Sequence, residues 1–264
     1  MKLVGRNHMM PQHSVSECIR FFQNCGYEGI ELSVLRSMGN AILSEIMEDY
    51  TIKQVMEVCA EKPDFAVSSL SCHNNYVTDD FVFGVQKKLL KTAKKYQTDI
   101  VIMSTFVPYE LREGNEKELY AKLEERTREL CRVAEGEGTM IAIEVEPNQL
   151  FRNLAIFLGM AERINSPALK LNFDIGHLYL SEIDIAKAAQ RSKDYIVHAH
   201  IENMCMGEHC HKLPWDGEID LKAACKSLND VGFDGYIALD LYLQDYAKVS
   251  AECVQYINNV VFEK

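Results

Sequence analysis

Residues 169–202, LKLNFDIGHLYLSEIDIAKAAQRSKDYIVHAHIE, contain two apolar runs that each finish in side chains able to bind a metal ion. Asp174 ends the first run, with His177 three residues later, and the second run holds His198 and His200. Because side chains alternate along a strand, Asp174 lies opposite the large apolar side chains of its run, and the two histidines share one face. Each run therefore predicts a strand with one apolar face and one ligand-bearing face.

An alternation of strand and helix extends from this stretch through the whole chain. Besides the two runs above, strands are predicted at residues 2–5, 29–33, 66–73, 100–104, 140–146 and 236–240. Helices are predicted at residues 14–25, 44–61, 80–97, 151–164, 183–191 and 220–230 and from about residues 115 and 244, with a long loop at 203–218. Ser14 with Glu17 has the spacing of a capping box at the first helix.

Eight strand–helix units in 264 residues average 33 residues each, which is the size of a βα repeat. The pattern predicts a single α/β domain over residues 1–264, a (β/α)8 TIM barrel. A doubly wound open sheet is the main alternative, but no glycine-rich phosphate loop follows the first strand.

Composition limits the class of protein. The formal net charge of −11 argues against a nucleic-acid partner, because such proteins present a basic face. The nine cysteines include no CxxC pair, which indicates reduced thiols. No run approaches the roughly 18 apolar residues of a membrane span, and KLVGRNHMM after Met1 is no signal-peptide core. We therefore expect a cytoplasmic protein without a membrane partner.

Polar side chains end four consecutive predicted strands: Glu144, Asp174, His200 and Asp240. In a TIM barrel these ends meet at one rim, where active sites lie. The residues two positions earlier are small or polar: Ala142, Asn172, His198 and Ala238. Their neighbours, expected to pack outward against helices, are apolar: Ile141, Ile143, Leu171, Phe173, Val197, Ile201, Ile237 and Leu239. Taken singly, each acid could be a loop cap or a surface ion-pair partner. All four side chains, however, are expected on the inward face of their strands, and this favours a metal site. Oxygen ligands with one imidazole suit Mn²⁺, Mg²⁺, Co²⁺ or Fe²⁺.

Several segments in this order carry a resemblance to a known family: GYEGIEL (26–32), IAIEVEPN (141–148), NFDIGHLYLSEID (172–184), HAHIEN (198–203), WDGEIDL (215–221) and GFDGYIALDLY (232–242). With this order and spacing the chain resembles the xylose isomerase-like TIM-barrel superfamily, the sugar-phosphate isomerases and epimerases related to type-2 AP endonucleases. The similarity is strongest in the C-terminal half.

The resemblance implies one divalent metal ion, most simply Mn²⁺ with Zn²⁺ among the alternatives, held by Glu144, Asp174, His200 and Asp240. It also implies that Glu144 and Asp240 are the two proton-transfer bases and that His177 contacts the substrate. Two departures matter. Asp240 stands where the epimerases carry Glu, and its shorter side chain weakens the two-base role. Met206 stands where the epimerases tend to carry an Arg.

Further residues are candidates for contact with the substrate. His73 ends the third strand, Glu146 follows Glu144 with the same parity and is its rival as a ligand, and His211 lies in the loop that often lines the pocket in this family. His8 and Glu31, near the first two strand ends, are weaker candidates. The segment CMGEHCH (205–211) also resembles a structural zinc site, although no second ligand pair stands at zinc-finger spacing.

The leading hypothesis is a metal-dependent isomerase or epimerase that moves a proton α to a carbonyl through an enediolate of a small keto-sugar or polyol-derived ketone. The alternative enzyme class is a dehydratase, such as the inosose or dehydroshikimate dehydratases of the family. An AP endonuclease and a non-catalytic sugar-binding barrel are further alternatives, and a homo-oligomer is left open.

Overall fold

The computed structural model describes residues 1–37, 41–182 and 184–264, and over these residues eight parallel strands close into a barrel. The strands are β1 (Lys2–Arg6), β2 (Gly29–Ser33), β3 (Ala66–His73), β4 (Ile100–Ser104), β5 (Met140–Glu144), β6 (Leu169–Asp174), β7 (Ile196–Ile201) and β10 (Tyr236–Leu239). They follow one another around the barrel in chain order, and β10 closes it by pairing with β1. The predicted (β/α)8 architecture is confirmed.

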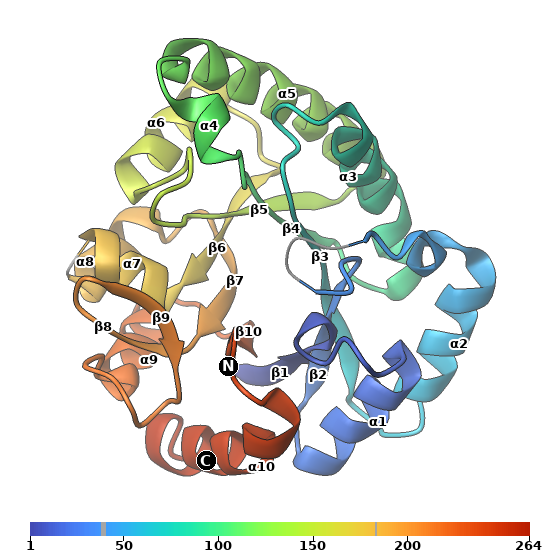
Figure 1. Ribbon diagram of the computed structural model, residues 1–264. Helices are drawn as coiled ribbons and strands as arrows, with labels where there is room; N and C mark the ends of the chain where they lie inside the picture. Colours follow the sequence, from blue (N-terminus) through green and yellow to red (C-terminus); the bar gives the residue numbers. More distant parts are fainter. Residues whose placement is uncertain (38–40, 183) are drawn as a thin grey trace.

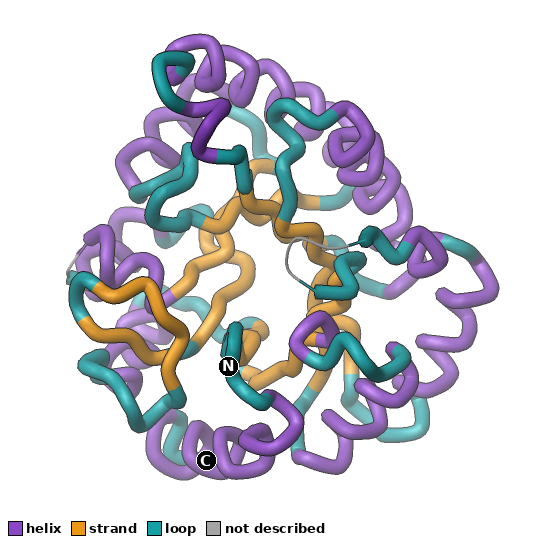
Figure 2. The backbone as a smooth tube through the Cα atoms, in the orientation of Figure 1, coloured by secondary structure: helices purple, strands orange, loops and turns teal. Residues whose placement is uncertain are grey.

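Helices surround the barrel on the outside (Figures 1 and 2). They are α1 (Val15–Cys25), α2 (Asp49–Cys59), α3 (Asp80–Thr92), α4 (Tyr109–Arg112), α5 (Glu116–Glu137), α6 (Leu154–Ile164), α7 (Ile175–Glu182), α8 (Ile185–Ser192), α9 (Leu221–Asp230) and α10 (Tyr246–Tyr256). Within the described ranges, none of them combines the length and apolar character needed to cross a membrane.

The start and end of α1 show how local chemistry sets the helix boundaries. The Ser14 side chain accepts a hydrogen bond from the Glu17 backbone N–H, and the Glu17 carboxylate accepts one from the Ser14 N–H, which confirms the capping box. Gly26 ends the helix with φ of 93°, a left-handed conformation that glycine adopts without strain. The chain then enters β2 directly.

Two hydrophobic clusters pack the protein, one outside the barrel and one inside it. The larger one joins the outward faces of the strands to the helices. A small one, formed by Ile100, Ile102 and Ala142, closes the barrel interior beneath the strand ends. Val197, predicted to face outward, packs against this inner cluster instead. The reason is a register shift at this point between β6 and β7, which gives β7 one extra residue and changes the alternation.

Several predicted boundaries differ from the observed ones. The helix predicted at residues 44–61 is a 3-10 turn (Ser44–Met47) followed by α2, and the helix at 80–97 is α3 followed by a 3-10 turn (Ala93–Tyr96). β5 ends at Glu144 rather than 146, because the Glu146 N–H bonds to the carbonyl of Phe151 in the following loop. Of the helix predicted at 183–191, Ile183 lies outside the described residues and the rest corresponds to α8.

Two elements near the rim were not predicted. α7 begins directly after β6, and the Asp174 carboxylate accepts a hydrogen bond from the His177 backbone N–H at 2.7 Å, as a helix-capping side chain does. The predicted loop 203–218 contains an antiparallel hairpin, β8 (Asn203–Cys205) and β9 (Glu208–Lys212), which lies beside α7 in Figure 1. Both elements carry side chains of the site described next.

Candidate active site

A cavity of about 490 Å³ opens at the carboxyl ends of the barrel strands. It is lined by polar side chains from β1, β3, β5 and β10 and their following loops, and from α7 and β9. The six residues predicted as catalytic or substrate-binding all line it: His73, Glu144, Glu146, His177, His211 and Asp240. Asp174 and His200 are fully buried beside them. The structure therefore brings every predicted site residue to one place.

The four predicted metal ligands gather around one nitrogen atom, Nδ1 of His200. This atom lies 3.0 Å from Oε2 of Glu144, 3.5 Å from Oδ2 of Asp174 and 3.6 Å from Oδ2 of Asp240. The ligand atoms of Glu144, Asp174 and His200 all lie within 4.8 Å of one another. We call Glu144, Asp174, His200 and Asp240 the four-ligand cluster.

Three polar atoms of the four-ligand cluster are buried and have no hydrogen-bond partner among the described residues: Asp174 Oδ2, His200 Nδ1 and Asp240 Oδ1. An unpartnered buried polar atom costs about 1–3 kcal/mol, and more when it is charged. Oδ2 of Asp174 and Nδ1 of His200 face each other at 3.5 Å, with Oε2 of Glu144 3.0 Å from the same nitrogen, so one bound cation would satisfy them together. The donor set thus fits a divalent ion.

Glu31, on β2, orients His200 from the opposite side. Its Oε2 lies 2.8 Å from Nε2 of His200, and both side chains are fully buried. A carboxylate there accepts a hydrogen bond from Nε2–H, which fixes the proton on Nε2 and leaves Nδ1 as the ligand atom, the pattern of histidines that bind metals. Burial and Arg6 lower the pKa of His200, but Glu31, Glu144 and Asp174 outweigh them and raise it well above its ordinary value.

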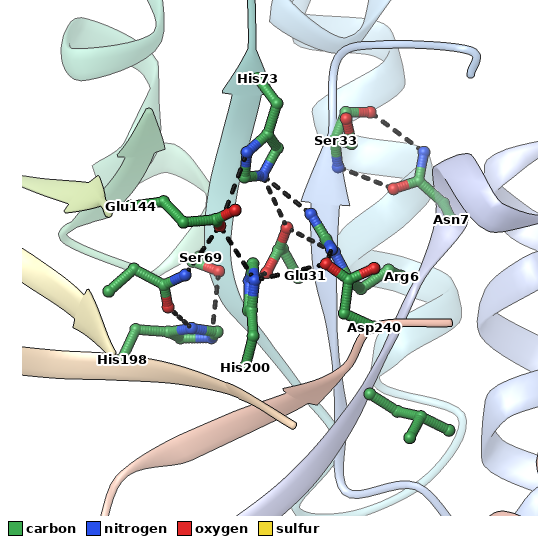
Figure 3. Close-up of polar contacts among 12 residues, drawn as sticks. Arg6, Asn7, Glu31, Ser33, Ser69, His73, Glu144, His198, His200 and Asp240 are labelled. Carbon is green, nitrogen blue, oxygen red and sulfur yellow. Dashed lines mark hydrogen bonds and ion pairs between the residues drawn. The ribbon is translucent and has the colours of Figure 1, made fainter. Parts of the chain in front are cut away.

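Arg6, at the end of β1, is the principal site residue that the sequence reasoning missed. Its buried guanidinium forms ion pairs with Asp240 and with Glu31, the latter at 3.0 Å, and Nη2 lies 2.8 Å from Nε2 of His73. Figure 3 shows these side chains pointing toward one another and toward His200. The first strand was predicted to end at Gly5, which left Arg6 out. The sequence signal for Arg6 as a site residue was its charge at the end of an apolar strand.

Three carboxylates of the cavity are held in the ionised form. Burial alone would raise the pKa of Glu144, but His73 and His200 lower it to about 2. The pKa of Asp174 is likewise lowered, against burial, by His177 and His200. For Asp240, Arg6 and then His211 and His200 overcome burial and lower the pKa.

The pKa values of two further acids are raised rather than lowered. Burial, together with the carboxylates of Glu144 and Asp174, raises the pKa of Glu146 well above its ordinary value. Glu146 lines the cavity, and its Oε2 is buried with no partner in the described part of the chain. Glu202 is fully buried, and burial and Asp174 raise its pKa in the same way. The raised pKa favours the protonated form of both carboxyl groups.

Glu202 supports the turn that carries Asp174. Its Oε1 accepts a hydrogen bond from the Gly176 N–H at 2.8 Å. A Cβ on Gly176 would lie 2.0 Å from this oxygen, so a glycine is required for the close approach. Glu202 stands two residues after His200, but it was not predicted as a site residue.

The histidines predicted to contact substrate surround the cluster. His73 lies between Arg6 and Glu144, with Nδ1 3.7 Å from Oε2 of the latter. His177 places Nδ1 3.4 Å from Oδ2 of Asp174. Burial lowers the pKa of His177. His8, a weaker candidate, also lines the cavity.

His198 has no atom in the cavity and supports it from below. Its Nδ1 lies 2.9 Å from Oδ1 of Asn172, and Asn172 in turn donates a hydrogen bond to Glu144 at 3.0 Å. Burial lowers the pKa of His198 to about 3, so the ring is neutral. His198 is therefore a core histidine that supports the site from one layer below His200.

Comparisons with known proteins agree with this geometry. A family model described as the xylose isomerase-like TIM barrel matches residues 19–256. A 3-dehydroshikimate dehydratase of Bacillus anthracis is 22% identical over 75% of this chain and 69% of its own length. An inosose isomerase of Bacillus velezensis is 25% identical over 86% of this chain and 83% of its own length. A crystal structure of IOLI protein with a binding zinc atom has the same fold, with a TM-score of 0.77 and 19% identity over 97% of this chain and 94% of that one.

Proposed function

Because the chain belongs to the xylose isomerase-like TIM barrel family, we propose that it is a divalent-metal-dependent isomerase or epimerase that moves a proton next to a carbonyl group. Its substrate is a small keto-sugar or a polyol-derived ketone. The observation that carries the proposal is the convergence of Glu144, Asp174 and Asp240 on Nδ1 of His200, with buried atoms that lack partners within the described residues.

Glu144, Asp174, His200 and Asp240 would hold the ion. Three carboxylates with one imidazole favour Mn²⁺, with Mg²⁺, Co²⁺, Fe²⁺ and Zn²⁺ as alternatives. A divalent ion at such a site withdraws charge from a carbonyl and a neighbouring hydroxyl, and so makes the adjacent C–H group more acidic.

Glu144 is the proposed general base. Its carboxylate lines the cavity, stays ionised at neutral pH and is held in place by Asn172. A carboxylate in this position takes the proton from the carbon next to the carbonyl. The same carboxylate can return the proton to the neighbouring carbon on the same face, while the hydroxyl proton moves to the former carbonyl oxygen. Such an isomerisation needs no second base on the opposite face of the substrate.

Asp240 is proposed chiefly as a ligand. The resemblance gives it a second base role, on the opposite face of the substrate, as epimerisation requires. Its ion pair with buried Arg6 holds the carboxylate, and its side chain is one methylene shorter than that of Glu, so both limit its reach toward the substrate. The geometry therefore favours isomerisation over epimerisation within the same reaction type.

A dehydratase is the second candidate, and Glu146 favours it. This carboxyl group lines the same cavity, and its raised pKa favours the protonated form, which can give a proton to a departing β-hydroxyl group. The similarity to a 3-dehydroshikimate dehydratase agrees with this candidate. The net charge of −11 supports neither an AP endonuclease nor another nucleic-acid partner, since such proteins present a basic face to the phosphates.

The reaction type is tested by incubating the Mn²⁺-loaded protein in D₂O with a panel of ketoses and inososes. We expect deuterium at the carbon next to the carbonyl, read by NMR, and no deuterium after the metal is removed with EDTA. Loss of water without exchange would move the assignment to the dehydratase. Neither exchange nor loss of water with any member of the panel would contradict both.

Metal affinity is expected to fall as the pH falls. The pKa of His200 is raised well above its ordinary value of about 6.5, so in the metal-free protein Nδ1 holds a proton that the ion must displace. Between about pH 8.5 and about pH 6.5, the dissociation constant for Mn²⁺ should rise by up to about tenfold per pH unit once the pH is below that pKa. Calorimetry in buffers of different ionisation enthalpy measures the constant and the released proton together. An affinity that is constant over this range, with no proton released, would contradict the assignment of His200 as a ligand.

A further inference from the structure

His8 is a buried histidine of the cavity wall that has no part in the proposed reaction. It belongs to the 3-10 turn Asn7–Met9, which follows β1 directly, and it is only 3% exposed. The side chain of Asn7 fixes this turn to β2, since it donates a hydrogen bond to the Ser33 carbonyl at 3.0 Å and accepts one from the Ser33 N–H at 2.7 Å (Figure 3). The imidazole of His8 therefore has a defined place in the wall of the cavity.

Neither ring nitrogen of His8 has a hydrogen-bond partner within residues 1–37, 41–182 and 184–264. A buried polar atom without a partner destabilises a folded protein, so this histidine lowers the stability of the ligand-free chain. His8 also belongs to none of the groups of described side chains that could hold a metal ion. A molecule bound in the cavity can supply the missing partner.

The ring of His8 is connected to the four-ligand cluster through a second histidine. The ring centroids of His8 and His73 lie 6.2 Å apart, and those of His73 and His200 lie 5.9 Å apart. His73 is therefore a neighbour of both, whereas His8 is not grouped with any metal ligand of the described chain. A ketone whose carbonyl and adjacent hydroxyl are bound at the cluster would reach His8 with a more distant part of the molecule.

The imidazole of His8 is neutral at pH 7. Burial, the Arg6 guanidinium and His73 lower its pKa well below the ordinary value of 6.5, and the carboxylates of Asp240 and Glu31 oppose this shift only in part. A neutral imidazole has one N–H donor and one acceptor nitrogen. A hydroxyl group both donates and accepts, whereas a carboxylate or a dianionic phosphate only accepts and would gain more from a cationic ring. The neutral ring thus suits an uncharged, hydroxylated ligand.

Apolar side chains flank His8 in this part of the wall. Met9, Tyr242 and Leu243 line the cavity, and together with His8 they also border a second hollow of about 400 Å³. They come from the segments that follow β1 and β10, which are paired neighbours in the barrel. Leu243 is 81% exposed with a φ of 70°, a left-handed conformation that is strained in a non-glycine residue, and such strain clusters at ligand contacts. Between apolar neighbours, one polar side chain decides which group of a ligand can lie against the wall.

We propose that His8 determines specificity by hydrogen-bonding a hydroxyl group that the substrate carries away from its metal-bound carbonyl. The proposal rests on the proposed function, because it takes the substrate to be a hydroxylated ketone, and it narrows that class to uncharged molecules. A site built to bond a hydroxyl group rejects an analogue that lacks it, since the buried polar atoms of the site then stay unpaired. A deoxy ketone should therefore bind more weakly than its hydroxylated parent.

The test measures binding rather than turnover, so it is independent of the reaction type. The full chain, loaded with Mg²⁺, is titrated with the panel of ketoses and inososes, and dissociation constants are read by saturation-transfer NMR. In His8→Phe, which removes both nitrogens, the constants of the ligands that bind the wild type should rise about 10- to 100-fold. His8→Gln, which keeps a donor and an acceptor, should recover much of the affinity. His13→Phe makes the same change at an exposed histidine and should bind like the wild type.

Two readouts separate recognition from a structural role. The dissociation constant for Mg²⁺ should be the same in His8→Phe as in the wild type, and the melting temperature of the ligand-free variant should be at least as high, because two unpaired nitrogens are gone. Monodeoxy analogues of the best ligand locate the contact. For the analogue that lacks the bonded hydroxyl group, the wild type and His8→Phe should bind equally.

Unchanged ligand affinity in a folded His8→Phe variant would overturn the proposal. So would a loss of affinity that is equal for every monodeoxy analogue, or a wild type that binds no member of the panel. If His8→Phe does not fold, His8→Leu removes the same nitrogens with a smaller side chain and decides by the same criteria. Ligands that bind through His8 but show neither deuterium exchange nor loss of water would support this proposal and contradict the proposed reaction.

Discussion

Replacing Glu144 by Gln is expected to lower kcat/KM by at least about 10³-fold, because one carboxylate serves both as base and as metal ligand. A positioned general base contributes about 10²–10⁴-fold by itself, and an amide cannot accept the proton. The Gln side chain has the same size and can still accept the hydrogen bond from Asn172, so the fold should be retained. The loss should appear mainly in kcat when the metal is saturating.

The matched control is Glu125→Gln, which makes the same chemical change on an exposed face of α5. Its activity should equal that of the wild type. Circular dichroism and the melting temperature of both variants show whether the barrel is intact. Full activity in a folded Glu144→Gln variant would remove Glu144 from the mechanism.

Replacing Arg6 by Met is expected to lower the free energy of unfolding of the metal-free protein by about 3–5 kcal/mol. The change leaves Glu31 and Asp240 buried without their cation, and buried charges without partners are strongly destabilising. Saturating Mn²⁺ should restore part of the loss, because a bound ion stabilises the folded state and compensates Asp240. Urea unfolding with and without Mn²⁺ measures both effects.

Arg20→Met is the control for this prediction. Arg20 pairs with Glu61 on the surface, and such exposed pairs contribute at most about 1 kcal/mol. If Arg6→Met does not fold, the double variant with Glu31→Gln removes one of the two uncompensated charges and should be more stable than Arg6→Met. A folded Arg6→Met variant within about 1 kcal/mol of the wild type would contradict the role of Arg6.

The barrel could be predicted because its signal is periodic and repeated. Each predicted strand is a short apolar run, and the helices between them have a 3-4 spacing that matches the observed buried faces. Boundaries were less predictable where backbone hydrogen bonds in loops decide them. β5 ends at Glu144 because Glu146 bonds to Phe151, and α7 starts at once because Asp174 caps it. Neither hydrogen bond can be seen in a sequence.

The site could be predicted in part. Glu144, Asp174, His200 and Asp240 could be predicted because each ends a strand and points inward, and the strand ends meet at one rim in this fold. Arg6 and the orienting role of Glu31 were missed or ranked low, because they depend on how the barrel closes. Closure places β1 beside β10, and it brings Glu31 of β2 to His200 of β7. The contact between His177 and His209 depends on the hairpin β8–β9, which brings His209 of β9 against His177 of α7.

The central claim is that a divalent ion lies among Glu144, Asp174, His200 and Asp240. Crystals soaked in Mn²⁺ and measured for anomalous scattering test it directly. The account predicts a peak about 2.0–2.3 Å from Nδ1 of His200 and from carboxylate oxygens of the three acids. A well-ordered crystal with no peak at this position, or with manganese bound only elsewhere, would contradict the account.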